Sequence, residues 1–238
     1  EVILTMKEID KSFPGVHALD HVNFEVKRGE VHALMGENGA GKSTLMKVLT
    51  GIYQKDSGSI TYKGQEVAFH NTREAQDNGI VIVHQELNMI GDLTVAQNIF
   101  IGREPRKFGL IDWHTMNKKA TELLKSLDID ARATDKLEEC SLAKQQMIAI
   151  ARAVDMKCQV LILDEPTSYL DIRYKLEFLS ILQKMAKETG LCVLMSLHEL
   201  DLAARISDKI ACVYEDRIDR FGTPEEIFTE GYIQRLYQ

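Results

Sequence analysis

The chain has 238 residues, of which 45% are hydrophobic and 27% are charged, and its formal net charge is −7. This is the composition of a soluble globular protein, and an acidic balance without a long basic run argues against a nucleic-acid partner. No apolar run approaches the length of about eighteen residues that a membrane-spanning helix needs, and the first residues show no signal-peptide pattern, so we expect a cytosolic protein. Four scattered cysteines without C-x-x-C spacing predict buried reduced thiols, and neither a metal site nor a disulfide framework.

The N-terminal segment, up to about Tyr62, is predicted to alternate short strands with turns. Strand-like apolar runs cover residues 2–4 and 22–26, and between them residues 11–15, KSFPG, form a turn that carries Phe13. An aromatic ring at this position could stack on a purine base or could fold onto the protein core. The local sequence favours neither interpretation.

A phosphate-binding loop is predicted at residues 36–44, GENGAGKST, which match the pattern G-x-x-x-x-G-K-[ST]. A strand predicted over 31–35 precedes this loop and a helix predicted over 44–50 follows it, which is the context that the motif requires. Such a loop wraps a polyphosphate with backbone N–H groups at a helix N-terminus. The alternative, an ordinary glycine-rich turn, is less favoured, so the segment predicts a nucleotide-binding protein.

The side chains of this loop have distinct predicted roles. Lys42 would contact the β- and γ-phosphates, and the hydroxyl of Ser43 would be a ligand of Mg²⁺. The full set of residues expected to bind the nucleotide here is Gly36, Asn38, Gly39, Gly41, Lys42, Ser43 and Thr44.

After the loop the pattern changes twice. Residues 56–62 and 66–69 predict a hairpin, and the apolar run 79–83 predicts a central parallel strand. Helical spacing then dominates residues 85–157, in segments 93–100, from Trp113 onward and 145–154, and indicates an inserted helical subdomain. Residues 1–84 and 158–238 would form the core of the single domain.

The core resumes after the helical segment with alternating strands and helices. The predicted elements are a strand over 160–163, a helix over 172–187, a strand over 192–196, a short helix and a strand over 210–214. This alternation predicts an α/β fold with a right-handed, mostly parallel sheet.

Two acids follow the apolar strand 160–163 directly. If that strand lies beside the strand of the phosphate loop, Asp164 at its end is placed to hold Mg²⁺. Glu165 would polarise the attacking water. The alternative, that two acids merely end a strand, is less favoured once the phosphate loop is granted.

This ordered set of motifs resembles the nucleotide-binding subunits of ABC transporters over essentially the whole chain. The resemblance implies a P-loop NTPase of ABC type, with an N-terminal antiparallel β subdomain. It implies that Gln85 contacts Mg²⁺ and the attacking water, that His198 contacts the γ-phosphate, and that Phe13 stacks on adenine. Residues 140–145, CSLAKQ, fall where the family has its signature, which implies a nucleotide role for Ser141, and Asp171 falls in the D-loop.

The resemblance also implies partners. Two copies would form an ATP-dependent, head-to-tail homodimer in which each signature closes the other copy's ATP, or the chain would pair with a second ABC domain. Transmembrane permease subunits would hold it at the inner face of the cytoplasmic membrane, where MgATP hydrolysis would drive an importer for a sugar or another small solute. The signature departs from the family pattern, because Leu142 and Ala143 replace two glycines, which puts fast hydrolysis in doubt.

The subfamily is divided along the chain. Residues 1–168 resemble the ATPases of simple-sugar importers, whereas residues 169–238, with phrases such as FGTPEEIF at 221–228, resemble those of iron-chelate and cobalamin importers. We interpret this as a mosaic, natural or engineered, with a diverged single-domain subunit as the alternative. Two other functions stay open: a soluble ABC-type ATPase that is not coupled to transport, and an engineered domain with weak turnover.

Overall fold

The computed structural model describes residues 1–84, 88–229 and 231–232, and its N-terminal part is an antiparallel sheet. The strand order in this sheet is β2–β1–β4–β5. Its strands are β1 (Val2–Phe13), β2 (Val16–Lys27), β4 (Ser57–Tyr62) and β5 (Gln65–Val67). The hairpin predicted around Lys63 is therefore present, and the predicted antiparallel β subdomain is confirmed.

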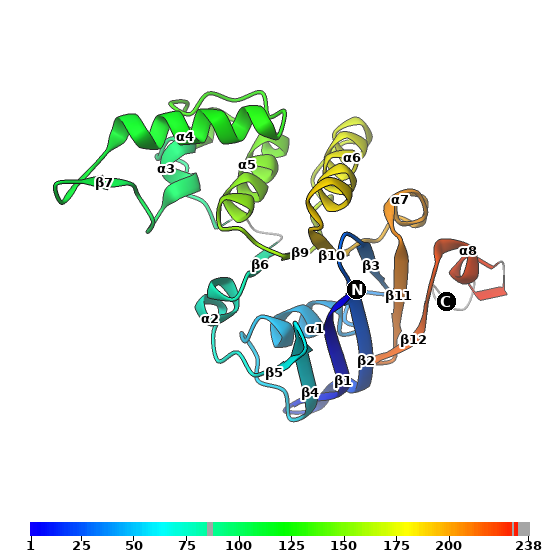
Figure 1. Ribbon diagram of the computed structural model, residues 1–238. Coiled ribbons are helices and arrows are strands. Elements are labelled where there is room, and N and C mark those ends of the chain that lie inside the picture. The colour runs from blue at the N-terminus through cyan, green and yellow to red at the C-terminus, as the bar shows by residue number, and fades with distance from the viewer. Residues whose placement is uncertain (85–87, 230, 233–238) are drawn as a thin grey trace.

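A second sheet forms the centre of the molecule, in the order β12–β11–β3–β10–β9–β6 (Figure 1). Its strands are β3 (Val31–Met35), β6 (Ile80–Val83), β9 (Val160–Leu163), β10 (Cys192–Ser196), β11 (Lys209–Tyr214) and β12 (Arg217–Gly222). All neighbouring pairs are parallel except β11 and β12, so the predicted mostly parallel α/β sheet is confirmed.

Two predicted positions in this sheet are wrong. The strand at 80–83 is not central, because β6 lies at the edge of the sheet. The strand that carries the two acids, β9, is not beside the phosphate-loop strand β3, because β10 lies between them. An apolar run shows that a strand is buried, but it does not show which strands are its neighbours.

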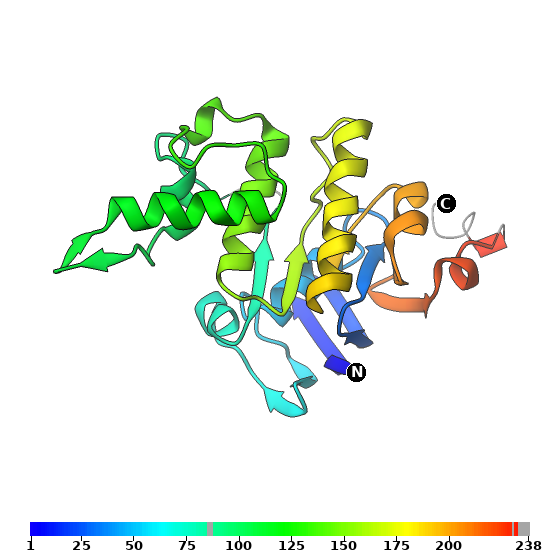
Figure 2. The same cartoon turned by 45° about the horizontal axis from the view of Figure 1, so that its top comes forward.

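Most of the helices follow the predicted segments closely, but two short ones, over 72–77 and 224–227, were not predicted. The helices are α1 (Lys42–Leu49), α2 (Thr72–Asp77), α3 (Val95–Phe100), α4 (Trp113–Ser126), α5 (Leu142–Asp155), α6 (Ile172–Thr189), α7 (Leu200–Ile206) and α8 (Pro224–Ile227), with a 3-10 turn at Leu137–Glu139. The region of α3, α4 and α5 extends away from the β6 edge of the sheet in both views, and the small hairpin of β7 (Arg106–Lys107) and β8 (Leu110–Ile111) projects from it (Figures 1 and 2). Among the described residues, no helix is both long and apolar enough to cross a bilayer.

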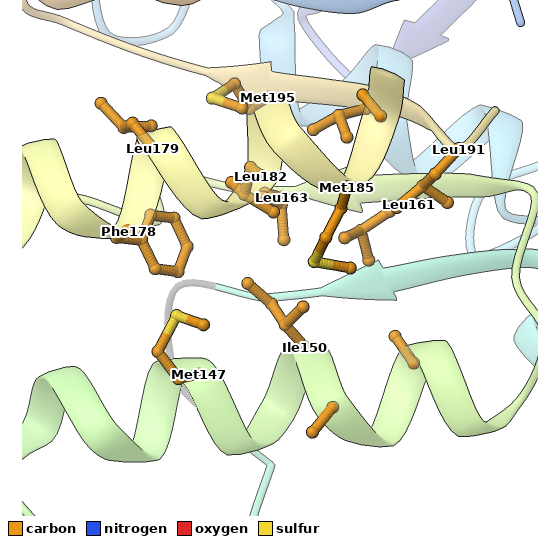
Figure 3. Packing of buried hydrophobic residues seen from close by; sticks show 14 of the residues in the cluster. Met147, Ile150, Leu161, Leu163, Phe178, Leu179, Leu182, Met185, Leu191 and Met195 are labelled. Carbon is orange, nitrogen blue, oxygen red and sulfur yellow. The ribbon is translucent and has the colours of Figure 1, made fainter. Parts of the chain in front are cut away.

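Side-chain alternation along the parallel strands divides the core into two clusters. On β3, Val31, Ala33 and Met35 face one cluster, whereas Leu34 faces the other. The first cluster joins the sheet to α3–α7, and Figure 3 shows α5 and α6 packing together over β9 and β10. The second cluster joins the sheet to α1 and the antiparallel sheet. Because α3–α5 share the first cluster with the sheet, a division at 85–157 remains our proposal.

Local sequence accounts for the ends of the helices. Asp112 begins α4 because its carboxylate accepts a hydrogen bond from the Thr115 N–H, and Thr94 forms a reciprocal capping box with Gln97 at the start of α3. The last helical turn of α6 ends at Gly190, whose φ of 72° suits a residue without a side chain.

Some elements differ from the predictions. The first two strands are each 12 residues long and form one hairpin around a turn at Pro14 and Gly15, whereas short strands at 2–4 and 22–26 were predicted. Register shifts between Met6 and Ile9, and again between Ile9 and Ser12, interrupt the alternation of polar and apolar residues. The sequence pattern therefore does not indicate the full length of β1. The strand β12 and the β7–β8 hairpin were not predicted.

We predict that truncating a core side chain of β10 destabilises the whole fold. Leu194 is fully buried in the second cluster, so Leu194→Ala is expected to lower the free energy of unfolding by about 2–5 kcal/mol. Urea unfolding followed by circular dichroism measures this change. The control is Leu110→Ala, because Leu110 is 75% exposed and its truncation is expected to change stability by less than about 0.5 kcal/mol. Equal effects of the two substitutions would contradict the assigned core.

Candidate functional site

The phosphate loop lies between the end of β3 and the start of α1, and two of its glycines are required by their neighbours. Gly36 has a φ of 151°, and a Cβ there would lie 2.2 Å from the carbonyl oxygen of Val213. Gly41 has a φ of 98°, and its Cβ would lie 2.5 Å from the carbonyl oxygen of Ala18. The loop therefore threads between β11 and β2 along a path that only glycine allows at these positions.

Lys42 begins α1 and is buried, with 5% of its surface exposed. Its Nζ donates hydrogen bonds to the carbonyl oxygens of Gly36, at 2.7 Å, and of Glu37, at 2.8 Å. Burial lowers the pKa of the ammonium, and the negative charges of Glu165 and Asp164 oppose that shift. The loop thus folds around a cation whose donors are available to a stronger acceptor, such as a phosphate.

A pocket of about 200 Å³ opens at this loop. Its lining residues are Asn38, Gly39, Gly41, Lys42, Ser43, Thr44 and Glu165. All of them were predicted from the sequence to act on a nucleotide, and Glu165 arrives from β9, more than a hundred positions along the chain. The fold therefore brings the predicted phosphate-binding residues and the predicted base to one cavity.

Asp164 directly follows β9 and is 9% exposed. The Ser43 hydroxyl of α1 donates to its Oδ1 over 3.1 Å, although β10 lies between β9 and β3, the strand that leads into the phosphate loop. The carboxylate and the hydroxyl supply oxygen donors, which a hard cation such as Mg²⁺ prefers. The separation of 3.1 Å is close to that of two adjacent ligands in an octahedral shell with metal–oxygen distances of about 2.1 Å.

Glu165 follows with a φ of 48°, a left-handed conformation that is uncommon for residues other than glycine. His198 Nε2 lies 2.9 Å from its Oε1, and the Ser168 hydroxyl donates to its Oε2 over 3.1 Å. Since an ionised carboxylate only accepts, Nε2 carries the proton of this contact. Burial raises the pKa of Glu165, but the hydrogen bonds from His198 and Ser168 and the charge of Lys42 outweigh it, so the net pKa is lowered.

Sequence reasoning missed one polar residue of the site. Ser196 is fully buried at the end of β10, where its Oγ accepts the Glu165 N–H over 2.7 Å and donates to Asp164 Oδ1 over 3.0 Å. A hydroxyl at the end of an otherwise apolar strand was the available signal. Its partners could not be inferred, because the neighbour relation of β9 and β10 was unknown.

The predicted roles of Phe13 and Gln85 are not tested by the described part of the structure. Phe13 ends β1, and its ring packs edge-to-face on Tyr53 with 5.0 Å between centroids. It is not among the described residues that line the phosphate-loop pocket. Gln85 lies outside the described residues. The roles assigned to both stay predictions.

Ser141 and Asp171 act as helix caps in this structure. The Ser141 hydroxyl accepts a hydrogen bond from the Lys144 N–H at the start of α5, over 3.4 Å. The Asp171 carboxylate accepts from the N–H groups of Arg173 and Tyr174 at the start of α6. The described lining of the phosphate-loop pocket includes neither residue, so their predicted contacts with a nucleotide stay predictions.

Comparison with known proteins gives consistent matches. A family profile described as ABC transporter matches residues 19–168. The galactofuranose transporter ATP-binding protein YtfR of Escherichia coli O157:H7 is 46% identical over 208 residues, which is 87% of this chain and 41% of that protein. The xylose import ATP-binding protein XylG of Thermoanaerobacter pseudethanolicus is 43% identical over 238 residues, 99% of this chain and 47% of that protein. The chain thus spans less than half the length of these relatives.

Solved structures match the fold over nearly the whole chain. The ADP conformation of MJ1267, an ATP-binding cassette of an ABC transporter, has a TM-score of 0.89 at 24% identity and covers 100% of this chain and 98% of its own. The dimeric bacterial ABC transporter cassette MJ0796 has a TM-score of 0.79 at 25% identity and covers 93% of this chain and 99% of its own. An identity averaged over a whole alignment does not separate residues 1–168 from 169–238, so the mosaic stays a prediction.

We predict that Glu165 contributes to the loss of folding stability at acidic pH. Its lowered pKa means that the ionised form stabilises the fold above the unfolded-state pKa, and that this contribution is lost as the pH falls through the folded-state pKa. The difference in melting temperature between the wild type and Glu165→Gln should therefore become smaller, or reverse, from about pH 5 to about pH 3. Thermal scans at several pH values measure it, with Glu66→Gln on exposed β5 as control. A difference that grows on acidification would contradict the assigned shift.

Proposed function

The chain belongs to the ABC transporter family, and on this basis we propose that it binds MgATP at the phosphate loop and hydrolyses it to power an importer. The observation that carries the proposal is the convergence of Lys42, Ser43 and Glu165 on one pocket, with Asp164 held against it by the hydrogen bond from Ser43. The relatives are described as a galactofuranose transporter protein and a xylose import protein, which favours a sugar or a similar small solute as cargo.

Binding of the nucleotide would use the backbone as much as the side chains. Residues of the loop and of the first turn of α1 line the pocket that would take the phosphates, and their backbone N–H groups would donate to the phosphate oxygens. The Lys42 ammonium, now held by two carbonyl oxygens, would turn its donors to the β- and γ-phosphate oxygens. Phe13 would stack on the adenine, next to Tyr53.

Mg²⁺ would be held by the Ser43 hydroxyl and the Asp164 carboxylate, the two oxygen donors that already lie 3.1 Å apart. When bound, the ion would neutralise charge on the phosphate oxygens during transfer. We assign a further metal contact to Gln85 on the family resemblance alone.

Hydrolysis would use Glu165 as the base. The carboxylate accepts a proton from water, the water oxygen bonds to the γ-phosphorus, and the bond from that phosphorus to the ADP oxygen breaks, with its electrons leaving on ADP. The lowered pKa keeps Glu165 ionised but makes it a weaker base while His198 and Ser168 bind it. If His198 turns to the γ-phosphate instead, Glu165 loses a hydrogen bond and its pKa rises toward the ordinary value. Nucleotide binding would thereby strengthen the base.

The active form is proposed to be a head-to-tail dimer. Ser141 lies exposed at the start of α5, outside the described lining of the phosphate-loop pocket, so a second copy would supply the anion-binding helix start for each ATP. The related cassette MJ0796 is described as dimeric. Permease subunits at the inner face of the membrane would convert closure of the dimer into transport.

We predict that Lys42→Ala abolishes nucleotide binding, because the ammonium is the cationic partner of the phosphates. MgATP at about a hundred times its Kd should stabilise the wild type by about 2.7 kcal/mol, which raises its melting temperature by several degrees. Differential scanning fluorimetry should show no such rise for Lys42→Ala. The control is Lys125→Ala, an exposed lysine of α4, which should keep the full rise. Unchanged stabilisation of Lys42→Ala by MgATP would overturn the assignment.

We predict that Glu165→Gln traps the dimer, because the amide cannot accept the proton of water and ATP therefore stays in the closed form. Gel filtration with MgATP should show a dimer for this variant and a monomer for the double variant Lys42→Ala with Glu165→Gln. If Glu165→Gln elutes only as a monomer while it binds ATP, the proposed dimer is wrong.

A further inference from the structure

The last residue of β10 is a hydroxyl in an otherwise apolar strand. Ser196 follows Cys192, Val193, Leu194 and Met195, and it is fully buried like them. It pairs with Leu34 of β3, while the preceding Met195 pairs with Leu163 of β9. The hydroxyl therefore lies between the strand that leads into the phosphate loop and the strand that ends in the two acids.

The Ser196 hydroxyl is one of two hydroxyl groups that donate a hydrogen bond to the same carboxylate oxygen of Asp164. Asp164 Oδ1 accepts from Ser43 at 3.1 Å and from Ser196 at 3.0 Å. Ser43 belongs to the phosphate loop and is the proposed metal ligand, so its oxygen would change partners if Mg²⁺ bound there. Ser196 lies on a core strand and can keep its hydrogen bond, so it holds the carboxylate orientation in both states.

Toward Glu165, Ser196 acts on the backbone. The Glu165 N–H donates to Ser196 Oγ over 2.7 Å, at the residue whose φ of 48° is left-handed. This hydrogen bond stabilises the turn that sends the Glu165 side chain into the phosphate-loop pocket and toward His198. An apolar residue at position 196 would leave this N–H without its acceptor in a buried place.

We infer that Ser196 is a positioning residue that aligns the metal ligand Asp164 and the base Glu165 through a single hydroxyl. The inference rests on the proposed function, because it explains how the two acids assigned there are held. It predicts that removal of the hydroxyl weakens the Mg²⁺-dependent part of nucleotide binding and leaves the metal-independent part intact.

The test compares the Kd of a fluorescent ATP analogue in Mg²⁺ and in EDTA. Ser196→Ala should lose about tenfold or more in affinity in Mg²⁺ and stay within about twofold of the wild type in EDTA. Asp164→Asn should show the same pattern, with a loss of affinity in Mg²⁺ and little change in EDTA. The matched control is Ser207→Ala, because Ser207 is also buried but its hydroxyl has no hydrogen-bond partner within the described part of the chain. It should bind as the wild type does in both conditions.

A second variant keeps the test valid if Ser196→Ala does not fold. Ser196→Cys has nearly the same size, but its thiol is a weak donor and a weak acceptor, so it should show the same loss in Mg²⁺. Circular dichroism and a melting curve confirm that each variant is folded. A folded Ser196→Cys or Ser196→Ala that keeps the full gain in affinity from Mg²⁺ would overturn the inference.

The role toward Glu165 has its own measurement. At saturating MgATP, kcat of Ser196→Ala should fall about tenfold or more below that of Ser207→Ala, since the base is misplaced even when the metal site is filled. An unchanged kcat would mean that Ser196 positions only the metal ligand Asp164, and it would overturn the proposed positioning of Glu165. A wild type that binds the analogue neither in Mg²⁺ nor in EDTA would instead overturn the proposed function, and the inference with it.

Discussion

Buried charges need partners, and this constraint organises the carboxyl edge of the parallel sheet. Lys42 and Asp164 are 5% and 9% exposed, and an ionised group so far from water is stable only where hydrogen bonds and opposite charges replace the solvent. The Lys42 ammonium obtains them from loop carbonyls and the nearby acids, and Asp164 obtains them from Ser43 and Ser196. Because those partners lie on the phosphate loop and on β10, the loop, β9 and β10 cannot shift independently. The site is one electrostatic unit built from three separate segments.

The same unit explains why the antiparallel sheet matters to a site it does not line. A Cβ added to Gly41 would lie 2.5 Å from a backbone oxygen of β2, and a Cβ added to Gly36 would lie 2.2 Å from a backbone oxygen of β11. The loop is therefore shaped on one side by the antiparallel sheet and on the other by the parallel sheet. Both sheets meet in one hydrophobic cluster around α1, so packing of apolar residues holds the two walls at the spacing that the loop requires. Burial of apolar side chains in this cluster therefore preorganises the phosphate loop.

The sequence predicted the local parts of this site well and their arrangement less well. The phosphate loop, the two acids and most helix bounds follow from patterns within a few residues, such as the glycine spacing around Lys42 or the apolar run before Asp164. The order of the strands does not, because pairing joins residues far apart in the chain. The sequence therefore predicts β6 at the centre of the sheet and β9 beside β3, whereas β6 lies at the edge and β10 lies between β9 and β3. The missed Ser196 has the same cause: its chemistry depends on which strand lies next to β10. The predicted length of β1 is too short because register shifts disturb the alternation of polar and apolar residues that indicates a strand.

The surface next to the proposed signature bears on how two copies would close. Large apolar side chains are exposed around the starts of α5 and α6, with Leu142 at 41%, Tyr169 at 62% and Ile172 at 64%. In the proposed dimer the start of α5 faces the partner's ATP, and the glycines of the family signature would let its backbone approach the phosphate closely. Leu142 prevents part of that approach but offers apolar surface, whose burial favours association without directional contacts. In the proposed dimer, apolar contact around Leu142 and Ile172 would therefore add to the hydrogen bonds to the γ-phosphate, and ATP would still be needed to bring the two copies together.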